Sequence, residues 1–168
     1  MSTNLTFGSE YHFYCEDTKH YLDVCNYAAD RTNYFLRVSS SPQKDRSPAT
    51  GTWKIVSASG KADGAPVKED DEIYLVNSWG GDNFLCAKED GTVLTTKDDK
   101  DPTRKWTFKI SGGSAEVGQP ILLMNETLGG FLCPTDTQME TAGCAGNKSV
   151  VVVRGAIQQL FEWIPIAK

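Results

Sequence analysis

The sequence predicts an all-β protein made of three similar units with four strands each, and three observations support this. An aromatic residue followed by leucine recurs in the stretches 19–25, 78–91 and 129–133. A tryptophan in a strand-like run follows each copy at a similar spacing. Helical periodicity is not sustained over any stretch long enough to predict a helix. A whole pattern that returns at a similar spacing marks an internal repeat.

Apolar runs bounded by Gly, Pro, Asn, Asp or Ser predict the strands of each unit. In the first unit they are 11–15, 21–25, 34–39 and 52–56. In the second unit they are 72–77, 83–87, 92–96 and 105–110. In the third unit they are 120–125, 130–134, 149–154 and 160–165. We expect one domain over 1–168, with repeats at about 7–58, 67–112 and 115–168, because the pattern runs through every polar link.

Composition and charge exclude several classes of function. The net charge is −5, and the Lys and Arg residues are scattered, which argues against nucleic acid as a partner. No apolar run is long enough for a membrane span. The N-terminal stretch 1–13 lacks the basic start and apolar core of a signal peptide. We therefore expect a cytoplasmic protein, or one released without a signal peptide.

The five cysteines predict thiols rather than disulfides, because their number is odd and no export signal accompanies them. We expect all five to be reduced. Cys86 and Cys133 follow the aromatic-Leu pair in two units, so we expect both to pack in the core as small apolar groups and to react slowly.

Twelve short strands in three units, each with a tryptophan, resemble a β-trefoil. In that fold six strands close a short barrel and three hairpins cap it. The resemblance implies that the aromatic-Leu pair recurs because each unit makes the same hairpin and inserts the same plug. Inward aromatic side chains from the three units would then meet on the pseudo-threefold axis.

The sequence offers no catalytic constellation. A Cys–His dyad would pair His12 with Cys15 or His20 with Cys25, but both separations are odd, so each pair points to opposite faces of a strand. Metal-binding and cofactor motifs are also missing from the sequence. We expect a binding protein with no catalytic activity and no cofactor.

The first unit resembles one repeat of a ricin-B-type lectin, through "YLDV" at 21–24, "YFLRV" at 34–38 and a terminal W-x-I. The resemblance implies that Asp23 accepts hydrogen bonds from sugar hydroxyls. The neighbouring contacts would come from Asn26, Asn33, Tyr34 and Arg37. The family's Q-x-W is absent, and Cys86 and Cys133 stand where Asp would be in the other units. The alternative for Asp23 is that it caps a turn.

A second candidate surface is the turn "NSWGGDN" at 77–83. An aromatic ring in a turn is a plausible stacking platform, and here Trp79 has Asp82 and Asn83 beside it. The alternative is that Trp79 folds back over the rim of the barrel.

The expected partners are glycans, as mono- or oligosaccharides bound weakly at each site, with a homodimer as one route to avidity. The other function considered is a protein-binding trefoil. Unit two, "NFLCAKEDGTVLTTKDDKDPTRKWTF", looks like a fascin-like actin-binding repeat. The long loops at 39–51 and 134–148 would also suit a trefoil protease inhibitor.

Overall fold

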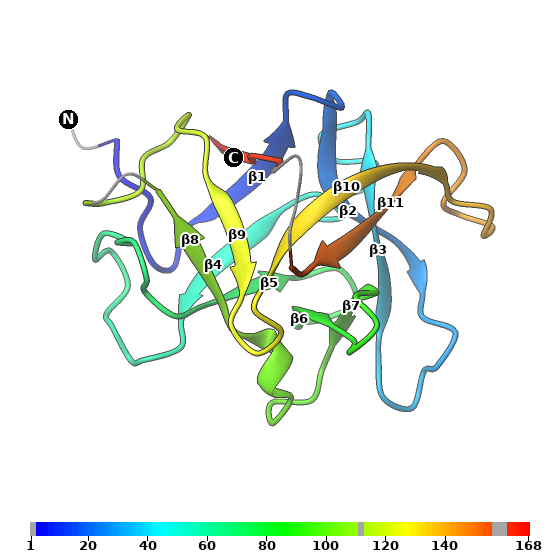
Figure 1. The fold of residues 1–168 in the computed structure, drawn as a ribbon, viewed down its shortest axis with the longest axis horizontal. Coiled ribbons are helices and arrows are strands. Elements are labelled where there is room, and N and C mark those ends of the chain that lie inside the picture. The colour runs from blue at the N-terminus through cyan, green and yellow to red at the C-terminus, as the bar shows by residue number, and fades with distance from the viewer. Residues whose placement is uncertain (1–2, 111–112, 156–160) are drawn as a thin grey trace.

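The computed structural model describes residues 3–110, 113–155 and 161–168 and contains twelve strands (Figure 1). The first six are β1 (Glu10–Cys15), β2 (His20–Tyr27), β3 (Leu36–Ser41), β4 (Trp53–Ser57), β5 (Ile73–Asn77) and β6 (Asn83–Ala87). The others are β7 (Val93–Thr96), β8 (Trp106–Lys109), β9 (Leu122–Asn125), β10 (Gly130–Gln138), β11 (Lys148–Val153) and β12 (Ile164–Ala167). A short 3-10 helix, η1 (Pro102–Arg104), precedes β8.

Each predicted run contains or overlaps one observed strand. Residue 160, the first of the last predicted strand, lies outside the described residues. Within the described part of the chain, no helix has the length and hydrophobicity needed to cross a bilayer.

Six strands form a closed barrel. Antiparallel pairing runs from β12 to β1, β4, β5, β8 and β9. A bridge between Ile121 and Trp163 closes the ring. There the Ile121 N–H donates to the Trp163 carbonyl at 2.9 Å, and the Trp163 N–H donates back at 2.8 Å. Closure leaves the barrel strands with neighbours on both sides, which removes exposed sheet edges.

The other six strands are three hairpins, β2–β3, β6–β7 and β10–β11, which cap one end of the barrel. The third strand of each unit, which is the second strand of its hairpin, contacts the third strands of the other two units. β3 pairs with β7 and with β11, and a bridge between Thr92 and Val151 joins the remaining side. Three four-strand units around one axis make this a β-trefoil, as the sequence predicted.

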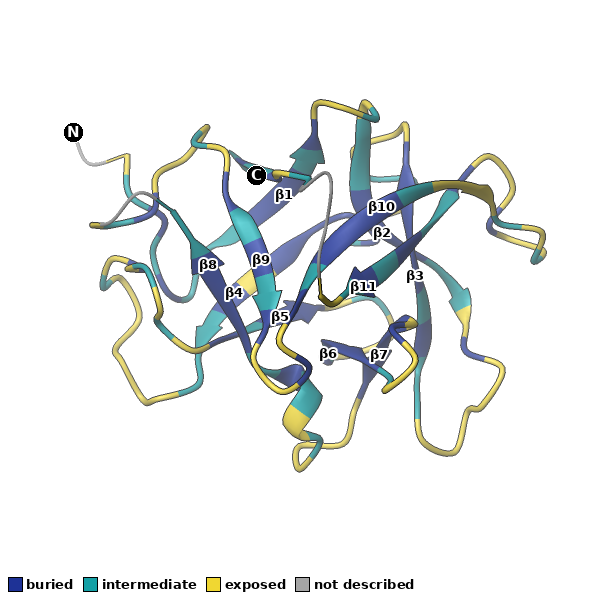
Figure 2. Cartoon of the chain, viewed as in Figure 1, coloured by how far each residue is buried: buried dark blue, intermediate teal, exposed yellow. Residues whose placement is uncertain are grey.

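The tryptophan and the leucine of the aromatic-Leu pair recur together because they are hydrogen-bonded to each other in every unit. Each indole is fully buried, and its Nε1–H donates to the carbonyl of the leucine in its own unit (Figure 2 shows the buried strands). The three bonds are Trp53 to Leu22 at 3.1 Å, Trp106 to Leu85 at 3.0 Å and Trp163 to Leu132 at 3.0 Å. A buried indole N–H needs such an acceptor.

The aromatic member of each aromatic-Leu pair does not point into the core. Tyr21, Phe84 and Phe131 are only half-buried, whereas the leucines that follow them are fully buried. Neighbouring residues of a strand point to opposite faces, so a leucine that faces the core turns the preceding aromatic ring away from it. The core plug is therefore a leucine and a tryptophan from each unit.

We predict that Trp53→Phe, Trp106→Phe and Trp163→Phe each lower the free energy of unfolding by about 2–4 kcal/mol. Each change removes core volume and leaves a buried leucine carbonyl without its indole donor. Urea denaturation followed by circular dichroism measures the loss. If any of the three substitutions changes the free energy of unfolding by less than about 0.5 kcal/mol, that tryptophan and its hydrogen bond do not stabilise the fold.

Candidate ligand-binding site

Two buried asparagines hold Trp79 in the turn between β5 and β6. The Asn77 Oδ1 accepts from the Trp79 N–H at 2.9 Å. The same side chain donates through Nδ2 to carbonyls of the segment 49–52, with a shortest contact of 3.0 Å to Ala49. The position of Trp79 is therefore fixed against the first unit.

Asn83 completes this turn rather than facing a ligand. It is fully buried, and its Nδ2 donates to the carbonyls of Asn77, Trp79 and Gly81 at 2.9, 3.2 and 2.9 Å. The expectation of an exposed Asn83 beside a sugar was wrong, because the inward carbonyls of the turn need a donor. Asp82 is exposed on the same turn.

The Trp79 ring is half-buried, so it folds back onto the protein only in part. One part packs on the core and on the Tyr27 ring, with ring centroids 5.8 Å apart. Tyr27 is 40% exposed and carries the Arg31 guanidinium over its face at 4.3 Å. Another part of Trp79 lines a pocket.

This Trp79 pocket has a volume of about 110 Å³ and lies where the first and second units meet. It is lined by Val24, Cys25, Asn26, Arg46, Ser47, Thr50 and Trp79. The structure thus brings together Asn26 and Trp79, which were predicted from different units. Sequence reasoning missed Arg46, Ser47 and Thr50. Their only sequence signal is the hydroxyl-rich composition of the loop 39–51.

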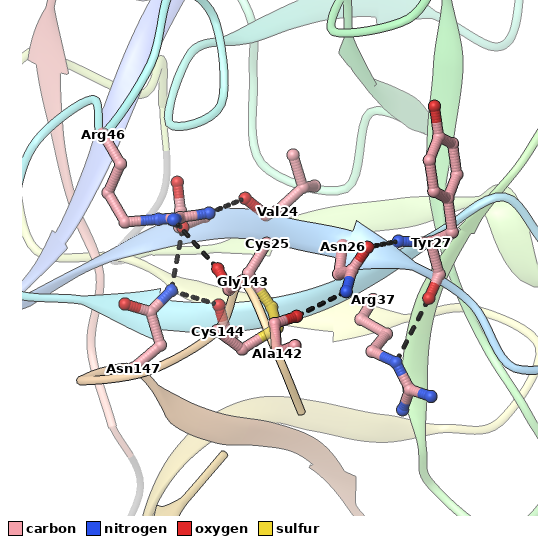
Figure 3. Close-up of a disulfide and its surroundings, with 12 residues drawn as sticks. Val24, Cys25, Asn26, Tyr27, Arg37, Arg46, Ala142, Gly143, Cys144 and Asn147 are labelled. Carbon is pink, nitrogen blue, oxygen red and sulfur yellow. Dashed lines mark hydrogen bonds and ion pairs between the residues drawn. A yellow bond between two sulfur atoms is a disulfide. The ribbon is translucent and has the colours of Figure 1, made fainter. Parts of the chain in front are cut away.

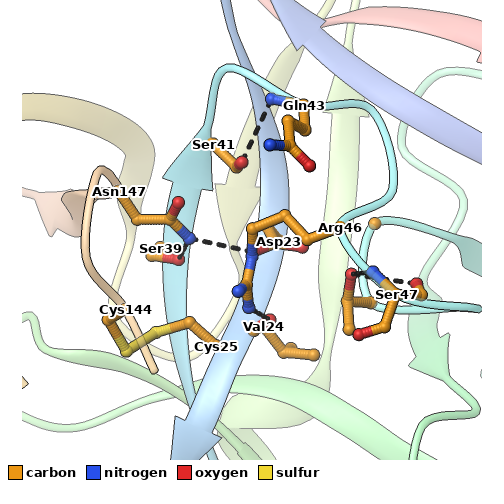
Figure 4. Close-up of polar contacts among 12 residues, drawn as sticks. Asp23, Val24, Cys25, Ser39, Ser41, Gln43, Arg46, Ser47, Cys144 and Asn147 are labelled. Atoms are coloured by element: carbon orange, nitrogen blue, oxygen red, sulfur yellow. Dashed lines mark hydrogen bonds and ion pairs between the residues drawn. A yellow bond between two sulfur atoms is a disulfide. The ribbon is translucent and has the colours of Figure 1, made fainter. Parts of the chain in front are cut away.

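Asp23 precedes Val24 of the pocket lining and is fully buried, so the expectation of a surface carboxylate was wrong. Figure 4 shows the polar contacts around it. Its Oδ2 accepts from the Arg46 Nε at 2.6 Å and from the Asn147 Nδ2 at 2.9 Å. Its Oδ1 is buried and has no hydrogen-bond partner among the described residues. Burial raises the pKa of Asp23, and the Arg46 guanidinium opposes that rise. The middle of β2 is buried because β3 pairs with it and the β10–β11 loop of the third unit covers it.

Arg46 connects the Asp23 carboxylate with two backbone carbonyls. Besides Asp23, it donates through Nη2 to the Val24 carbonyl at 2.8 Å and through Nη1 to the Gly143 carbonyl at 3.1 Å. Its side chain is 23% exposed. A guanidinium has five N–H groups, and the contacts to described residues use three of those of Arg46.

A disulfide fastens the third unit to this site. Cys25 and Cys144 are bonded, with their Cα atoms 5.0 Å apart (Figure 3). The Asn26 Nδ2 also donates to the Ala142 carbonyl in the same loop. The prediction that all five cysteines are reduced was therefore wrong. The count of cysteines could not reveal a pairing between residues 119 positions apart.

The other predicted residues lie elsewhere. Asn33 and Tyr34 line a second hollow of about 240 Å³ together with Arg31, Phe35 and Lys97 among others. The Asn33 amide donates to Asp30 at 3.0 Å, and Tyr34 packs against Cys86. Arg37 lines neither of these hollows. The candidates predicted around "YLDV" therefore do not form one site.

The fold has close counterparts among solved structures, although no protein-family model and no curated protein matches the sequence. A Caenorhabditis elegans protein of unknown function is 17% identical with a TM-score of 0.81, over 98% of this chain and 97% of that one. The SDF2-like protein from Arabidopsis thaliana is 19% identical with a TM-score of 0.79, over 96% and 94%. A chain of the S. cerevisiae protein O-mannosyltransferase Pmt1-Pmt2 complex, solved bound to its sugar donor, is 14% identical with a TM-score of 0.79. That match covers 97% of this chain and 25% of the other. At these identities the matches show a shared fold.

We predict that Asp23→Ala lowers the free energy of unfolding by about 3 kcal/mol, because it leaves the Arg46 and Asn147 donors without their acceptor. The matched control is Asp82→Ala, which removes an exposed carboxylate and should change stability by less than about 0.5 kcal/mol. Chemical denaturation at neutral pH measures both. Equal effects of the two substitutions would contradict the role given to Asp23.

We predict that a thiol reagent labels the native protein very slowly. Cys15, Cys86 and Cys133 are free and buried, and burial raises the pKa of Cys86 and of Cys133, which depletes the reactive thiolate. After unfolding without a reductant, three thiols should react, and with a reductant all five. Mass spectrometry counts the labels. Five labels without a reductant would disprove the disulfide.

Proposed function

We propose that this protein is a non-catalytic carbohydrate-binding protein and that the Trp79 pocket is its sugar site. The observation that carries the proposal is an aromatic ring held rigidly beside fixed polar groups in one hollow. The apolar C–H face of a sugar packs on an aromatic ring, and its hydroxyls need donors and acceptors nearby. The ring is that of Trp79, and the free N–H groups are those of Arg46.

The remaining polar groups suit hydroxyl recognition. Ser47 is exposed at the pocket, where its hydroxyl can both donate and accept. The Asn26 amide uses its Oδ1 for the Tyr27 N–H and one Nδ2 hydrogen for Ala142, which leaves its second hydrogen. These partners hold the amide in one orientation. Preformed polar groups reduce the entropy lost on binding.

The size of the pocket sets the strength of binding. At about 110 Å³ it is much smaller than the roughly 300–1,000 Å³ of a pocket that encloses a drug-sized ligand. It holds one sugar unit in part, with the rest of the ligand in solvent. We therefore expect dissociation constants from millimolar to micromolar, roughly −4 to −8 kcal/mol. A second site or a homodimer would raise the avidity.

Two further observations are consistent with this proposal. The same fold occurs in a protein O-mannosyltransferase complex, an assembly that handles sugars, although the match spans only a quarter of that chain. The Cys25–Cys144 disulfide favours an oxidising environment. Of the two locations expected, we therefore propose release from the cytoplasm.

We predict that Trp79→Ala weakens glycan binding at least tenfold, because it removes the stacking face of the pocket. A glycan array finds the sugar, and calorimetry with that sugar compares the variants. The matched control is Tyr14→Ala, which removes a half-buried ring that packs on Tyr21 outside the pocket and should leave affinity unchanged.

A silent array for the wild-type protein would overturn the sugar-binding proposal. Actin co-sedimentation and protease-inhibition assays would then test the protein-binding alternatives. Binding that survives Trp79→Ala would keep the function but remove it from this pocket.

A further inference from the structure

A separate hollow lies on the axis of the cap, where β3, β7 and β11 meet. This axial pocket has a volume of about 250 Å³. It is lined by Arg37, Val38, Thr92, Val93, Leu94, Met139, Ser149, Val150 and Val151, so each of the three units contributes. It shares no lining residue with the Trp79 pocket.

The wall of the axial pocket is apolar and preformed. Val38, Val93, Leu94 and Val150 are all buried, between 2% and 9% exposed. They are held by strand pairing, such as that of Arg37 with Leu94 and the bridge of Thr92 with Val151. The thioether of Met139 is flexible and can adapt to the shape of a bound molecule. This wall favours an apolar group over a sugar, because its described lining residues include no aromatic ring.

Among the described residues that line the pocket, Arg37 is the one that carries a charge. Its Nε donates to the Tyr27 carbonyl at 3.2 Å (Figure 3). Within the described part of the chain its terminal nitrogens have no hydrogen bond, and its charge has no carboxylate within ion-pair distance. By contrast, Arg46 is paired with Asp23 and Arg154 with Glu89. A guanidinium at the edge of an apolar hollow therefore has four N–H groups to offer.

We propose that the axial pocket binds a small monocarboxylate with an apolar tail. The planar guanidinium matches a carboxylate through two parallel hydrogen bonds, and the tail covers the valine and leucine wall. A neutral molecule would desolvate the guanidinium without compensating its charge, and a cation would be repelled. The volume lies between that of a cavity that admits benzene, about 150 Å³, and that of a drug-sized pocket, so the ligand is a small acid.

The test uses sodium hexanoate as the probe and the intact protein with its disulfide. Hexanoate should shift the backbone amide resonances of Val38, Leu94 and Val150 in a saturable manner. 1-Hexanol has the same chain without the charge, and hexylammonium has the opposite charge. Both should bind at least tenfold more weakly than hexanoate.

The matched variants separate charge from folding. Arg37→Gln should weaken hexanoate binding at least tenfold, and Arg37→Lys should restore part of it. Arg31→Gln removes an arginine that lines a different hollow and should have no effect. Thr92→Phe, at an exposed position of the pocket wall, should block the site while leaving Arg37 in place. Thermal unfolding confirms that each variant is folded.

Shifts that do not saturate, equal binding of hexanol, or equal binding by folded Arg37→Gln would each overturn the proposal. None of these measurements uses a sugar, so their outcome is independent of whether the Trp79 pocket binds glycans.

Discussion

The trefoil depends on one hydrogen bond made three times, from a buried indole to a leucine carbonyl in the same unit. Each bond links the last strand of a unit to its second strand, which means that it ties the barrel to the cap. The indole supplies core volume, and its buried N–H has a hydrogen-bond acceptor in the leucine carbonyl. The three links fasten each hairpin to the closed barrel.

The core keeps the threefold pattern, but the surface does not. Asn77 and Asn125 end equivalent strands and both tie their turns to neighbouring backbone, whereas the first unit has Cys15 at that place. The loop between β10 and β11 of the third unit lies over the second strand of the first unit. That loop brings Cys144 and Asn147 to Cys25 and Asp23. The side chains around the second strand of the first unit therefore differ from those at the equivalent strands of the other two units.

The buried pair of Asp23 and Arg46 gives this junction its rigidity. Arg46 contacts the first unit through Asp23 and Val24 and the third unit through Gly143, while its exposed part reaches the Trp79 pocket. By sequence, Asp23 resembles an aspartate that binds sugar hydroxyls. In the structure its carboxylate binds the Arg46 guanidinium instead. The residue that contacts solvent is the arginine, which the resemblance did not indicate.

The sequence by itself determined the fold class, the number of strands and the burial of the tryptophans. These follow from local patterns, namely alternation within a strand, turn residues between strands and recurrence of the unit. The sequence also indicated Trp79 as a candidate ligand contact, because a large aromatic ring is unusual in a Gly-rich turn.

Only the tertiary structure decided which side chains meet. The disulfide, the burial of Asp23 and the meeting of Asn26 with Trp79 all join different units, and no spacing within a unit specifies them. The same holds for Arg37, whose neighbours in the axial pocket come from all three units. Strand patterns fix the face on which a residue lies, but the packing of loops and hairpins around the axis fixes what covers that face.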